Sequence, residues 1–265
     1  MRHILIAGDG PVARALANAL AAAGEVTSRW RRGDPRPTAA AEIAIVAVRD
    51  AAISAVATQL MALGAVERRS ILLHCAGVLP PEEAFRGLPV AGIGLLHPLR
   101  ALVGDPDEAH LAGTVFGVAG DALGVKTATE LVEGLGGRPL PLGREALARY
   151  HAAAALASNH PLALVDQAVD LLVELGLDRA TATSSLAELV ASMAHNLIAQ
   201  GLPRALTGPI ARGDVATIAR HWAALPEETR PLYRATARAT VALARKKGAA
   251  EGATLDAIAA LLEGD

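Results

Sequence analysis

The sequence predicts an α/β protein in which a doubly wound sheet domain is followed by a second, all-helical domain. As far as about residue 143, short apolar runs alternate with helical runs, and Gly- and Pro-containing turns separate them. A glycine-rich turn directly follows the first of these runs, and the strand signal disappears after Pro141. We therefore place the α/β domain at residues 1–143 and the helical domain at residues 144–265.

The strands are predicted by apolar runs that do not alternate with polar residues. Runs of this kind occupy residues 3–7, 42–48 and 70–74, and they are typical of strands buried on both faces of a parallel sheet. Helical stretches at residues 12–23 and 52–63 lie between them. This alternation predicts right-handed crossovers and a doubly wound sheet.

The second half is predicted to be helical throughout. Four stretches have helical character, and a Gly/Pro-rich break spans residues 201–213. No low-complexity linker separates the halves, so we interpret the boundary as a change of fold class. The predicted helices are residues 144–175, 178–200, 214–225 and 229–247.

Composition argues against several functional classes. The formal net charge of −2 and the 2% of aromatic residues are unlike those of a nucleic-acid-binding protein. No stretch approaches the ~20 apolar residues of a membrane span. Cys75 is the single cysteine, which excludes an internal disulfide, and no histidine or cysteine spacing is typical of a metal site. We expect a cytoplasmic protein with no bound metal.

The turn after the first strand has the pattern of a dinucleotide-binding site. Residues 8–13 read GDGPVA and fit G-x-G-x-x-[G/A] between a strand and a helix. Gly8 permits the tight turn, Gly10 lets the backbone approach a pyrophosphate, and Ala13 keeps the helix close to the strand. This context predicts a Rossmann domain. The alternative is a Rossmann domain that has lost its cofactor.

Arginines near the end of the second strand favour NADP(H) over NAD(H). Where an acidic residue would bind the ribose of NAD, residues 28–32 read SRWRR, and Asp34 falls in the following loop. Guanidinium groups suit a 2′-phosphate; the alternative is a solvated arginine run. The predicted cofactor-binding residues are Gly8, Gly10, Pro11, Val12, Ala13, Arg29, Arg31, Arg32 and Val48.

The first helix after the boundary carries candidate catalytic residues. His151 and Asn159 are eight positions apart, about two helical turns, so they share a face, and Ser158 lies beside them. Polar side chains on an otherwise apolar helix need partners, either in a site or in a buried network. We predict His151 and Asn159 as catalytic and Ser158 as substrate-binding.

Two further residues complete the predicted site. His97 follows an apolar run and should lie at a strand end, where substrate-side residues of α/β folds gather; a purely structural histidine is the alternative. A histidine that titrates near neutrality could protonate a ketone oxygen. Arg212 precedes Asp214, a predicted helix N-cap, and could bind a substrate carboxylate; a local salt bridge is the alternative.

Seven short motifs together resemble one family. The chain is similar to Rossmann-like proteins, described as oxidoreductases, that carry a helical C-terminal "domain of unknown function 2520". The resemblance extends over nearly the whole chain. The motifs are residues 46–50 (VAVRD), 74–77 (HCAG), 96–99 (LHPL), 150–154 (YHAAA), 157–159 (ASN), 205–209 (ALTGP) and 212–214 (RGD).

The resemblance implies membership of the 6-phosphogluconate dehydrogenase-type superfamily. Its relatives by architecture include ketopantoate reductase, pyrroline-5-carboxylate reductase and prephenate dehydrogenase. It implies a nicotinamide cofactor, a substrate cleft between the two domains and a homodimer formed through the helices. One feature departs from this superfamily, because Lys126, Lys246 and Lys247 do not match the lysine that its hydroxyacid reductases use as a proton donor.

These observations lead to a functional hypothesis. We expect an NADP(H)-dependent oxidoreductase that reduces a small 2-oxo or imino acid bearing a carboxylate, with neither a nucleic-acid nor a membrane partner. The alternative is a non-catalytic NADP(H)-binding module that senses redox state through a helical dimer.

Overall fold

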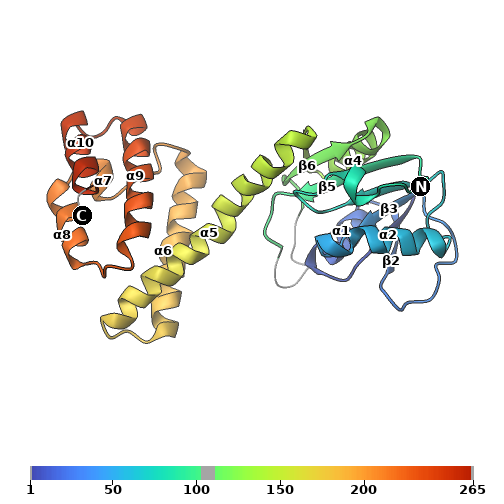
Figure 1. Cartoon of the computed structure of the whole chain (residues 1–265), viewed down its shortest axis with the longest axis horizontal. Helices are drawn as coiled ribbons and strands as arrows, with labels where there is room; N and C mark the ends of the chain where they lie inside the picture. Colours follow the sequence, from blue (N-terminus) through green and yellow to red (C-terminus); the bar gives the residue numbers. More distant parts are fainter. Residues whose placement is uncertain (1, 103–110, 264–265) are drawn as a thin grey trace. The chain divides into compact units, whose positions relative to one another are not determined.

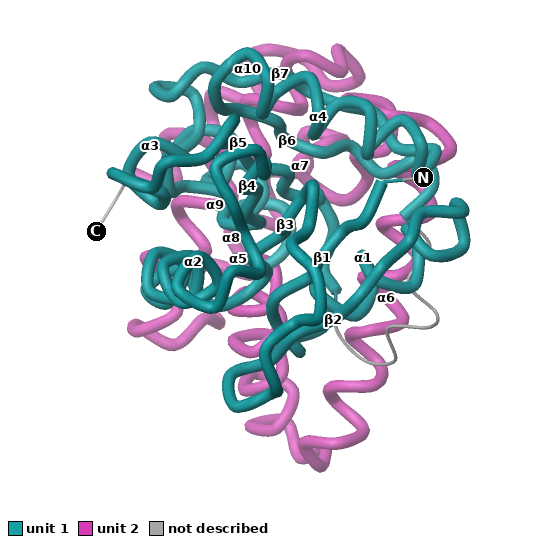
Figure 2. The backbone as a smooth tube through the Cα atoms, turned by 90° about the vertical axis from the view of Figure 1, so that its right-hand side faces the viewer, with its two compact units in different colours: residues 1–160 teal, residues 161–265 magenta. Residues whose placement is uncertain are grey.

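The computed structural model describes residues 2–102 and 111–263. The chain forms two compact units, residues 1–160 and residues 161–265 (Figure 2). The first unit extends past residue 143 because Leu147 packs against Leu95 and Ala119 of the sheet. It therefore includes the first half of helix α5 (Leu147–Glu174).

The first unit contains a seven-stranded sheet with the order β2-β1-β3-β4-β5-β6-β7 (Figure 1). All neighbouring strands are parallel except β5 and β6, which pair antiparallel. The predicted doubly wound fold is confirmed, with this one antiparallel step added. The strands are β1 (His3–Ala7), β2 (Val26–Trp30), β3 (Ile43–Val46), β4 (Ile71–His74), β5 (Gly92–Pro98), β6 (Val115–Gly120) and β7 (Arg138–Pro141).

Helices cover both faces of this sheet, which explains the non-alternating strands. In β1, Ile4 and Ile6 pack with α1 (Pro11–Ala22) and α4 (Ala122–Gly134) on one face. Leu5 and Ala7 pack with α2 (Ile53–Ala62) and α3 (Pro81–Ala84) on the other. Successive side chains point to opposite faces, so every position of β1 after His3 is buried.

The strand order reverses between β1 and β3, which are hydrogen-bonded neighbours although β2 separates them in the sequence. In open α/β sheets, ligands bind outside the carboxyl ends of the strands at such a switch point. The glycine turn follows β1, and Val48 lies shortly after β3. The fold thus brings both segments to the edge where a nucleotide would bind.

The second unit is helical, and its core lies among α7, α8, α9 and α10. Asp214 caps α8 as predicted, since its Oδ1 accepts a hydrogen bond from the Thr217 N–H at 3.0 Å. The sequence interpretation missed two elements, α7 inside the predicted break and α10 near the C-terminus. The helices after α5 are α6 (Arg179–Gln200), α7 (Pro209–Arg212), α8 (Val215–Ala224), α9 (Arg230–Lys247) and α10 (Gly252–Leu261). Among the described residues, none of the helices combines the length and apolarity needed to cross a membrane.

Candidate functional site

The glycine turn after β1 is shaped by contact with the end of β3. Gly8 has a φ of +140°, which side-chain-bearing residues rarely adopt. A Cβ atom at this position would overlap the backbone carbonyl oxygen of Ala47. The Gly8 N–H donates a hydrogen bond of 2.9 Å to the Trp30 carbonyl oxygen at the end of β2. The turn is therefore built against both strands that flank β1, and position 8 requires glycine.

The start of α1 has room and hydrogen-bond donors for a phosphate. Gly10 is the N-cap, and a Cβ added there would meet no protein atom within 4 Å. Pro11 takes the first helical position, where a missing N–H costs nothing, and helix geometry leaves the N–H groups of Val12 and Ala13 without intrahelical acceptors. Open space above free N–H groups at a helix N-terminus fits a dinucleotide pyrophosphate.

Two of the three predicted phosphate-binding arginines are held by an acid in the glycine turn. Asp9 forms ion pairs with Arg29 and, at 3.6 Å, with Arg31. Arg31 also lies 3.5 Å from Asp34, whereas Arg32 has no ion pair with any residue of the described part. The cluster carries three positive charges and two negative charges, so Asp9 partly neutralises the site predicted for the 2′-phosphate.

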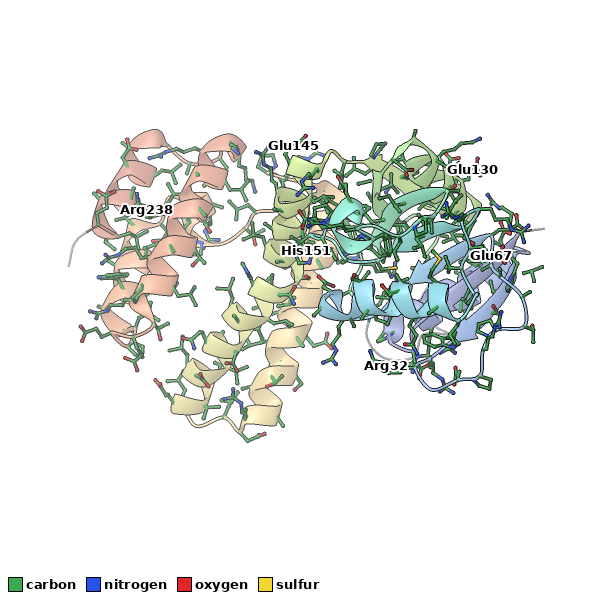
Figure 3. All side chains as sticks on the ribbon, turned by 45° about the vertical axis from the view of Figure 1, so that its right-hand side comes forward. Arg32, Glu67, Glu130, Glu145, His151 and Arg238 are labelled. Carbon is green, nitrogen blue, oxygen red and sulfur yellow. The ribbon has the colours of Figure 1, made fainter. Side chains whose placement is uncertain are left out.

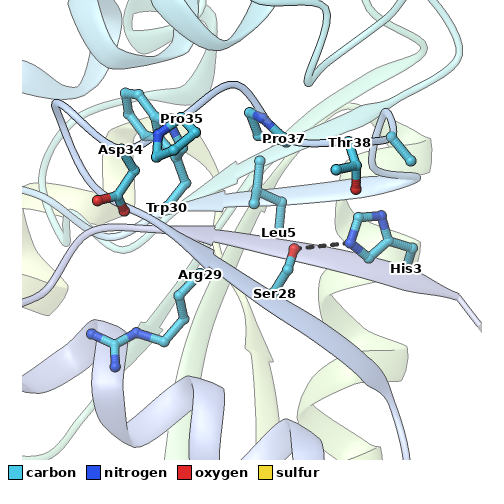
Figure 4. Close-up of a pocket in the computed structure, with 10 residues that line it drawn as sticks. His3, Leu5, Ser28, Arg29, Trp30, Asp34, Pro35, Pro37 and Thr38 are labelled. Atoms are coloured by element: carbon cyan, nitrogen blue, oxygen red, sulfur yellow. Dashed lines mark hydrogen bonds between the residues drawn. The ribbon is translucent and has the colours of Figure 1, made fainter.

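A cavity of about 290 Å³ lies along β2, and its lining includes Arg29 and Asp34 but neither Arg31 nor Arg32. Its lining includes His3 and Ser28, joined by a hydrogen bond of 2.8 Å, and Trp30 and Pro35. Figure 4 shows the Arg29 side chain leaving β2 on the side opposite Trp30 and Pro35. The guanidinium group faces Asp9 instead, so the cavity adjoins the arginine cluster at Arg29 and Asp34.

Two predicted catalytic residues, His97 and His151, meet above Gly77. His97 lies on β5 and His151 on α5, the helix on which Figure 3 labels it, and their ring centroids are 5.7 Å apart. A Cβ at Gly77 would lie 2.6 Å from His151 Cδ2 and 3.1 Å from His97 Nε2. Glycine at position 77 therefore lets both imidazoles approach the segment after β4. This juxtaposition is the candidate catalytic centre.

Tyr150 fixes His97 from the opposite side. Its hydroxyl lies 3.1 Å from His97 Nδ1 and 3.0 Å from the His97 carbonyl oxygen, and it accepts a hydrogen bond of 3.2 Å from the Gly117 N–H. A Cβ at Gly117 would lie 2.9 Å from the tyrosine ring, so this glycine on β6 makes space for Tyr150. His97 is thus held by side-chain and backbone contacts.

The environment of His97 keeps its imidazole neutral. Burial, followed by the nearby His151, lowers the pKa of His97 to about 4, and Asp50 opposes this shift. At neutral pH, His97 is therefore a hydrogen-bond partner rather than the histidine titrating near neutrality that a proton donor to a ketone requires. His151 is exposed.

His74 and Cys75 lie at the end of β4, next to this centre. Burial, with a smaller contribution from His97, lowers the pKa of His74 to about 4. Burial raises the pKa of the Cys75 thiol to about 12, so the reactive thiolate is absent at neutral pH. Across residues 2–102 and 111–263, no three His, Cys, Asp or Glu side chains gather in a way that could hold a metal ion.

Of the remaining predicted site residues, Ser158 and Asn159 belong to the first unit and Arg212 to the second. The Ser158 hydroxyl lies 2.9 Å from the Ala154 carbonyl oxygen and 3.0 Å from Asn159 Oδ1, two acceptors for its single hydrogen. Both side chains are exposed, and no hydrogen bond links them to His97 or His151 within the described residues. Arg212 belongs to the second unit, where it lines a surface cavity with Lys247. The catalytic role of Asn159 and the substrate-binding roles of Ser158 and Arg212 therefore stay predictions.

Sequence reasoning did not assign a role to Asp9, Gly77 or Tyr150. Asp9 occupies a variable position of the glycine pattern, and nothing local identifies it as the partner of Arg29. Gly77 and Tyr150 appeared only within the family motifs. Tyr150 lies directly before His151, but its contact residue His97 is 53 positions away, and only the fold reveals such a pair.

The sheet, its switch point and the glycine turn define a Rossmann fold. The family model described as "Domain of unknown function (DUF2520)" matches residues 114–240. This match bears out the resemblance drawn from the sequence motifs. No curated protein matches the sequence significantly.

Solved structures with this fold include enzymes that use either nicotinamide cofactor. A protein of Thermotoga maritima is 23% identical with a TM-score of 0.66, covering 98% of each chain. Plasmodium falciparum pyrroline carboxylate reductase, solved with NADP bound, is 11% identical with a TM-score of 0.56, covering 99% of this chain and 98% of that one. An NADH-preferring ketol-acid reductoisomerase from an uncultured archaeon is 15% identical with a TM-score of 0.62, covering 94% and 85%. These likenesses concern the fold.

Proposed function

We propose that the protein is an NADP(H)-dependent oxidoreductase that reduces a small 2-oxo or imino acid. The observation that carries this proposal is the turn at Gly8, which only glycine fits and which leads into the open N-terminus of α1. The arginines beside β2 favour the 2′-phosphate of NADP(H). The His97–His151 pair provides polar groups at the same edge of the sheet.

Different residues of the first unit would bind the cofactor and handle the proton. Reduced nicotinamide, when bound, supplies a hydride. Val12 and Ala13 would bind the pyrophosphate through their N–H groups, and Arg31 and Arg32 would bind the 2′-phosphate. His151, which is exposed, would hold or deliver a proton at a substrate oxygen or nitrogen, while His97 accepts a hydrogen bond.

The first test is a titration with NADPH and, separately, with NADH, followed by energy transfer from Trp30 to the reduced nicotinamide. We expect tighter binding of NADPH. The double variant Arg31→Ala/Arg32→Ala should weaken NADPH binding by roughly 10- to 100-fold, since a hydrogen bond to a charged group contributes about 1.5–3 kcal/mol. NADH binding should change little, because NADH lacks the 2′-phosphate.

A matched control is Arg69→Ala. Arg69 is an exposed arginine before β4, and it pairs with Glu67 at 3.2 Å. Removing it should leave both affinities unchanged. Equal losses of NADPH and NADH in the double variant would contradict the proposed cofactor preference. Binding of neither nucleotide would refute the oxidoreductase proposal itself.

Turnover distinguishes an enzyme from the redox-sensing alternative. NADPH oxidation should be followed with a panel of 2-oxo acids and cyclic imino acids, in the wild type and in His151→Gln. Oxidation that depends on the acid and on His151 is expected. Tight NADPH binding without turnover of any member would instead favour the non-catalytic module.

We also propose that a second copy of the chain covers α5 and α6. Within residues 161–200 of the described chain, only Val169 and Ala182 are buried, so these helices contribute little to their own unit's core. Large apolar side chains are exposed along them, including Leu162 on α5 (69%) and Ile198 on α6 (86%). Apolar surfaces of this kind mark protein interfaces.

Light scattering on the eluting protein tests the assembly. The wild type should have the mass of a dimer, and Leu189→Glu/Ile198→Glu should have the mass of a monomer. Leu123→Glu is the control, because Leu123 is an exposed leucine on α4 in the first unit. A monomeric wild type, or a double variant that remains dimeric, would contradict the proposal.

A further inference from the structure

The Tyr150 hydroxyl is placed among three polar atoms of the sheet. Its oxygen lies 3.1 Å from His97 Nδ1, 3.0 Å from the His97 carbonyl oxygen and 3.2 Å from the Gly117 nitrogen. All three distances are in hydrogen-bond range for these atom types. A tyrosine hydroxyl has one hydrogen to donate and can accept from other groups.

Counting hydrogens determines the direction of each bond. The Gly117 nitrogen can only donate, and the carbonyl oxygen of His97 can only accept. The contact between the hydroxyl and carbonyl oxygens therefore requires the single tyrosine hydrogen, because without it two oxygens would face each other. The contact with Nδ1 then requires a hydrogen on Nδ1. Only this assignment gives each of the three contacts a hydrogen.

The opposite edge of the His97 ring faces the candidate catalytic centre. A Cβ at Gly77 would meet His97 Nε2 and Cδ2, each at 3.1 Å, and His151 Cδ2 at 2.6 Å. Among residues 2–102 and 111–263, none forms a hydrogen bond with His97 Nε2. A neutral imidazole with its hydrogen on Nδ1 has a lone pair on Nε2.

We propose that Tyr150 is a positioning residue, which holds His97 in the Nδ1-protonated form so that Nε2 faces Gly77 and His151 as a hydrogen-bond acceptor. A ligand group bound at Nε2 must then carry hydrogen. On the proposed function, this group is the N–H of a protonated imine or the hydroxyl of a 2-hydroxy acid. A bare ketone oxygen does not fit at Nε2 and would have to face His151.

The assignment also agrees with the electrostatics of the site. His97 is neutral at neutral pH because burial and the nearby His151 lower its pKa to about 4. The neighbouring His74 has the opposite tautomer, because its Nδ1 accepts a hydrogen bond of 3.2 Å from the Ala76 N–H and its hydrogen is therefore on Nε2. One spectrum should thus contain both tautomers.

The test is long-range ¹⁵N–¹H correlation NMR of the full-length protein labelled with ¹⁵N-histidine, recorded at pH 7.5 without nucleotide. His97→Gln and His74→Asn assign the two ring systems. We expect wild-type His97 to show a protonated Nδ1 and an unprotonated Nε2, and His74 to show the reverse. A wild-type His97 with its hydrogen on Nε2 overturns the proposal. This measurement on the wild-type protein requires no variant of Tyr150.

Tyr150→Phe tests the role of the hydroxyl. The variant keeps the ring that packs on Gly117 but removes the acceptor for Nδ1, so His97 should lose its fixed tautomer and populate the Nε2-protonated form. Tyr233→Phe is the matched control, because the Tyr233 hydroxyl lies 3.0 Å from His221 Nδ1 in the second unit. It should leave the His97 signals unchanged. An unaltered His97 tautomer in a folded Tyr150→Phe protein also overturns the proposal.

The NMR measurement of the His97 tautomer does not depend on the proposed function. It needs neither nucleotide nor substrate, so a failure of NADPH to bind refutes the oxidoreductase proposal without changing the His97 result. Where turnover is found, Tyr150→Phe should lower kcat/KM by roughly 10- to 100-fold, the size of effect known for partners that orient metal-ligating histidines. NADPH affinity should change less than twofold. An equal loss of NADPH affinity would show a structural role instead.

Discussion

Acid should destabilise the first unit through His74. The side chain is fully buried, with 0% of its surface exposed, and its pKa is lowered from 6.5 to about 4 by burial and, to a smaller extent, by His97. Its Nε2 is buried and has no hydrogen-bond partner among the described residues. A proton taken up in the folded state would therefore create a buried charge without a counter-ion.

The sign of the effect follows from proton binding in the two states. Between pH 6.5 and about pH 4, His74 is protonated in the unfolded chain but neutral in the folded one. The unfolded state binds more protons in this window, so stability rises with pH there. The contribution of His74 is complete above pH 6.5 and is lost as the pH falls towards 4. At about 1.4 kcal/mol per pKa unit, the full loss is roughly 3 kcal/mol.

Urea unfolding at pH 7.5 and pH 4.5 measures this loss. Fluorescence of Trp30, in a Trp222→Phe background, reports on the first unit. Because carboxylates also titrate in this range, the comparison is with His74→Asn, whose side-chain oxygen can still accept from the Ala76 N–H. The wild type should lose roughly 2–3 kcal/mol more than the variant between the two pH values.

The control for this comparison is His195→Asn, which removes an exposed histidine from α6. It should lose as much stability on acidification as the wild type does. If the wild type and His74→Asn lose the same free energy, His74 is not held neutral by its burial. The reasoning about this buried histidine would then be refuted.

Three further predictions concern the site residues. Gly8→Ala should lower the free energy of unfolding by roughly 1–3 kcal/mol because of backbone strain, whereas Gly10→Ala should fold normally and lose nucleotide affinity. Urea unfolding measures the first effect and NADPH titration the second. Equal losses of stability in the two variants would contradict the different backbone conformations of Gly8 and Gly10. Asp9→Asn should tighten NADPH binding by roughly two- to fivefold, since it removes a negative charge beside the arginines, and weaker binding would mean that Asp9 orients them. Gly77→Ala should displace His151, so turnover should fall while NADPH affinity and unfolding free energy change little.

The sequence was sufficient for features that local patterns encode. The strand at residues 3–7, the glycine turn and the helix after it form a continuous local signal, because backbone conformation and burial at neighbouring positions depend on each other. The four long helices of the second half were predicted to within a few residues for the same reason. Asp214 was identified as a cap because a capping side chain and its N–H partner are three residues apart.

The features that the sequence did not predict depend on tertiary contacts. The antiparallel pairing of β5 with β6 is set by how the chain returns to the sheet, which strand composition does not specify. His97 and His151 were each predicted as candidates, but nothing in the sequence shows that their rings meet above Gly77. The lowered pKa of His97 likewise depends on burial and on a neighbouring histidine, neither of which the sequence alone shows.

The sheet topology explains why the glycine turn and the histidine pair lie at the same edge of the sheet. Strands β1, β3, β4 and β5 are consecutive parallel neighbours, so their carboxyl ends, with the Gly8 turn and the His97–His151 pair, face the same side. Adjacent strands are about 4.8 Å apart, which places the strand of Gly8 and the strand of His97 roughly 14 Å apart. A ligand that contacts both must lie extended along this edge, as a molecule built from two nucleotides can. On the proposed function, the adenine half of the cofactor would lie at the glycine turn and the nicotinamide half nearer the histidine pair, and the separation of the two strands gives room for both.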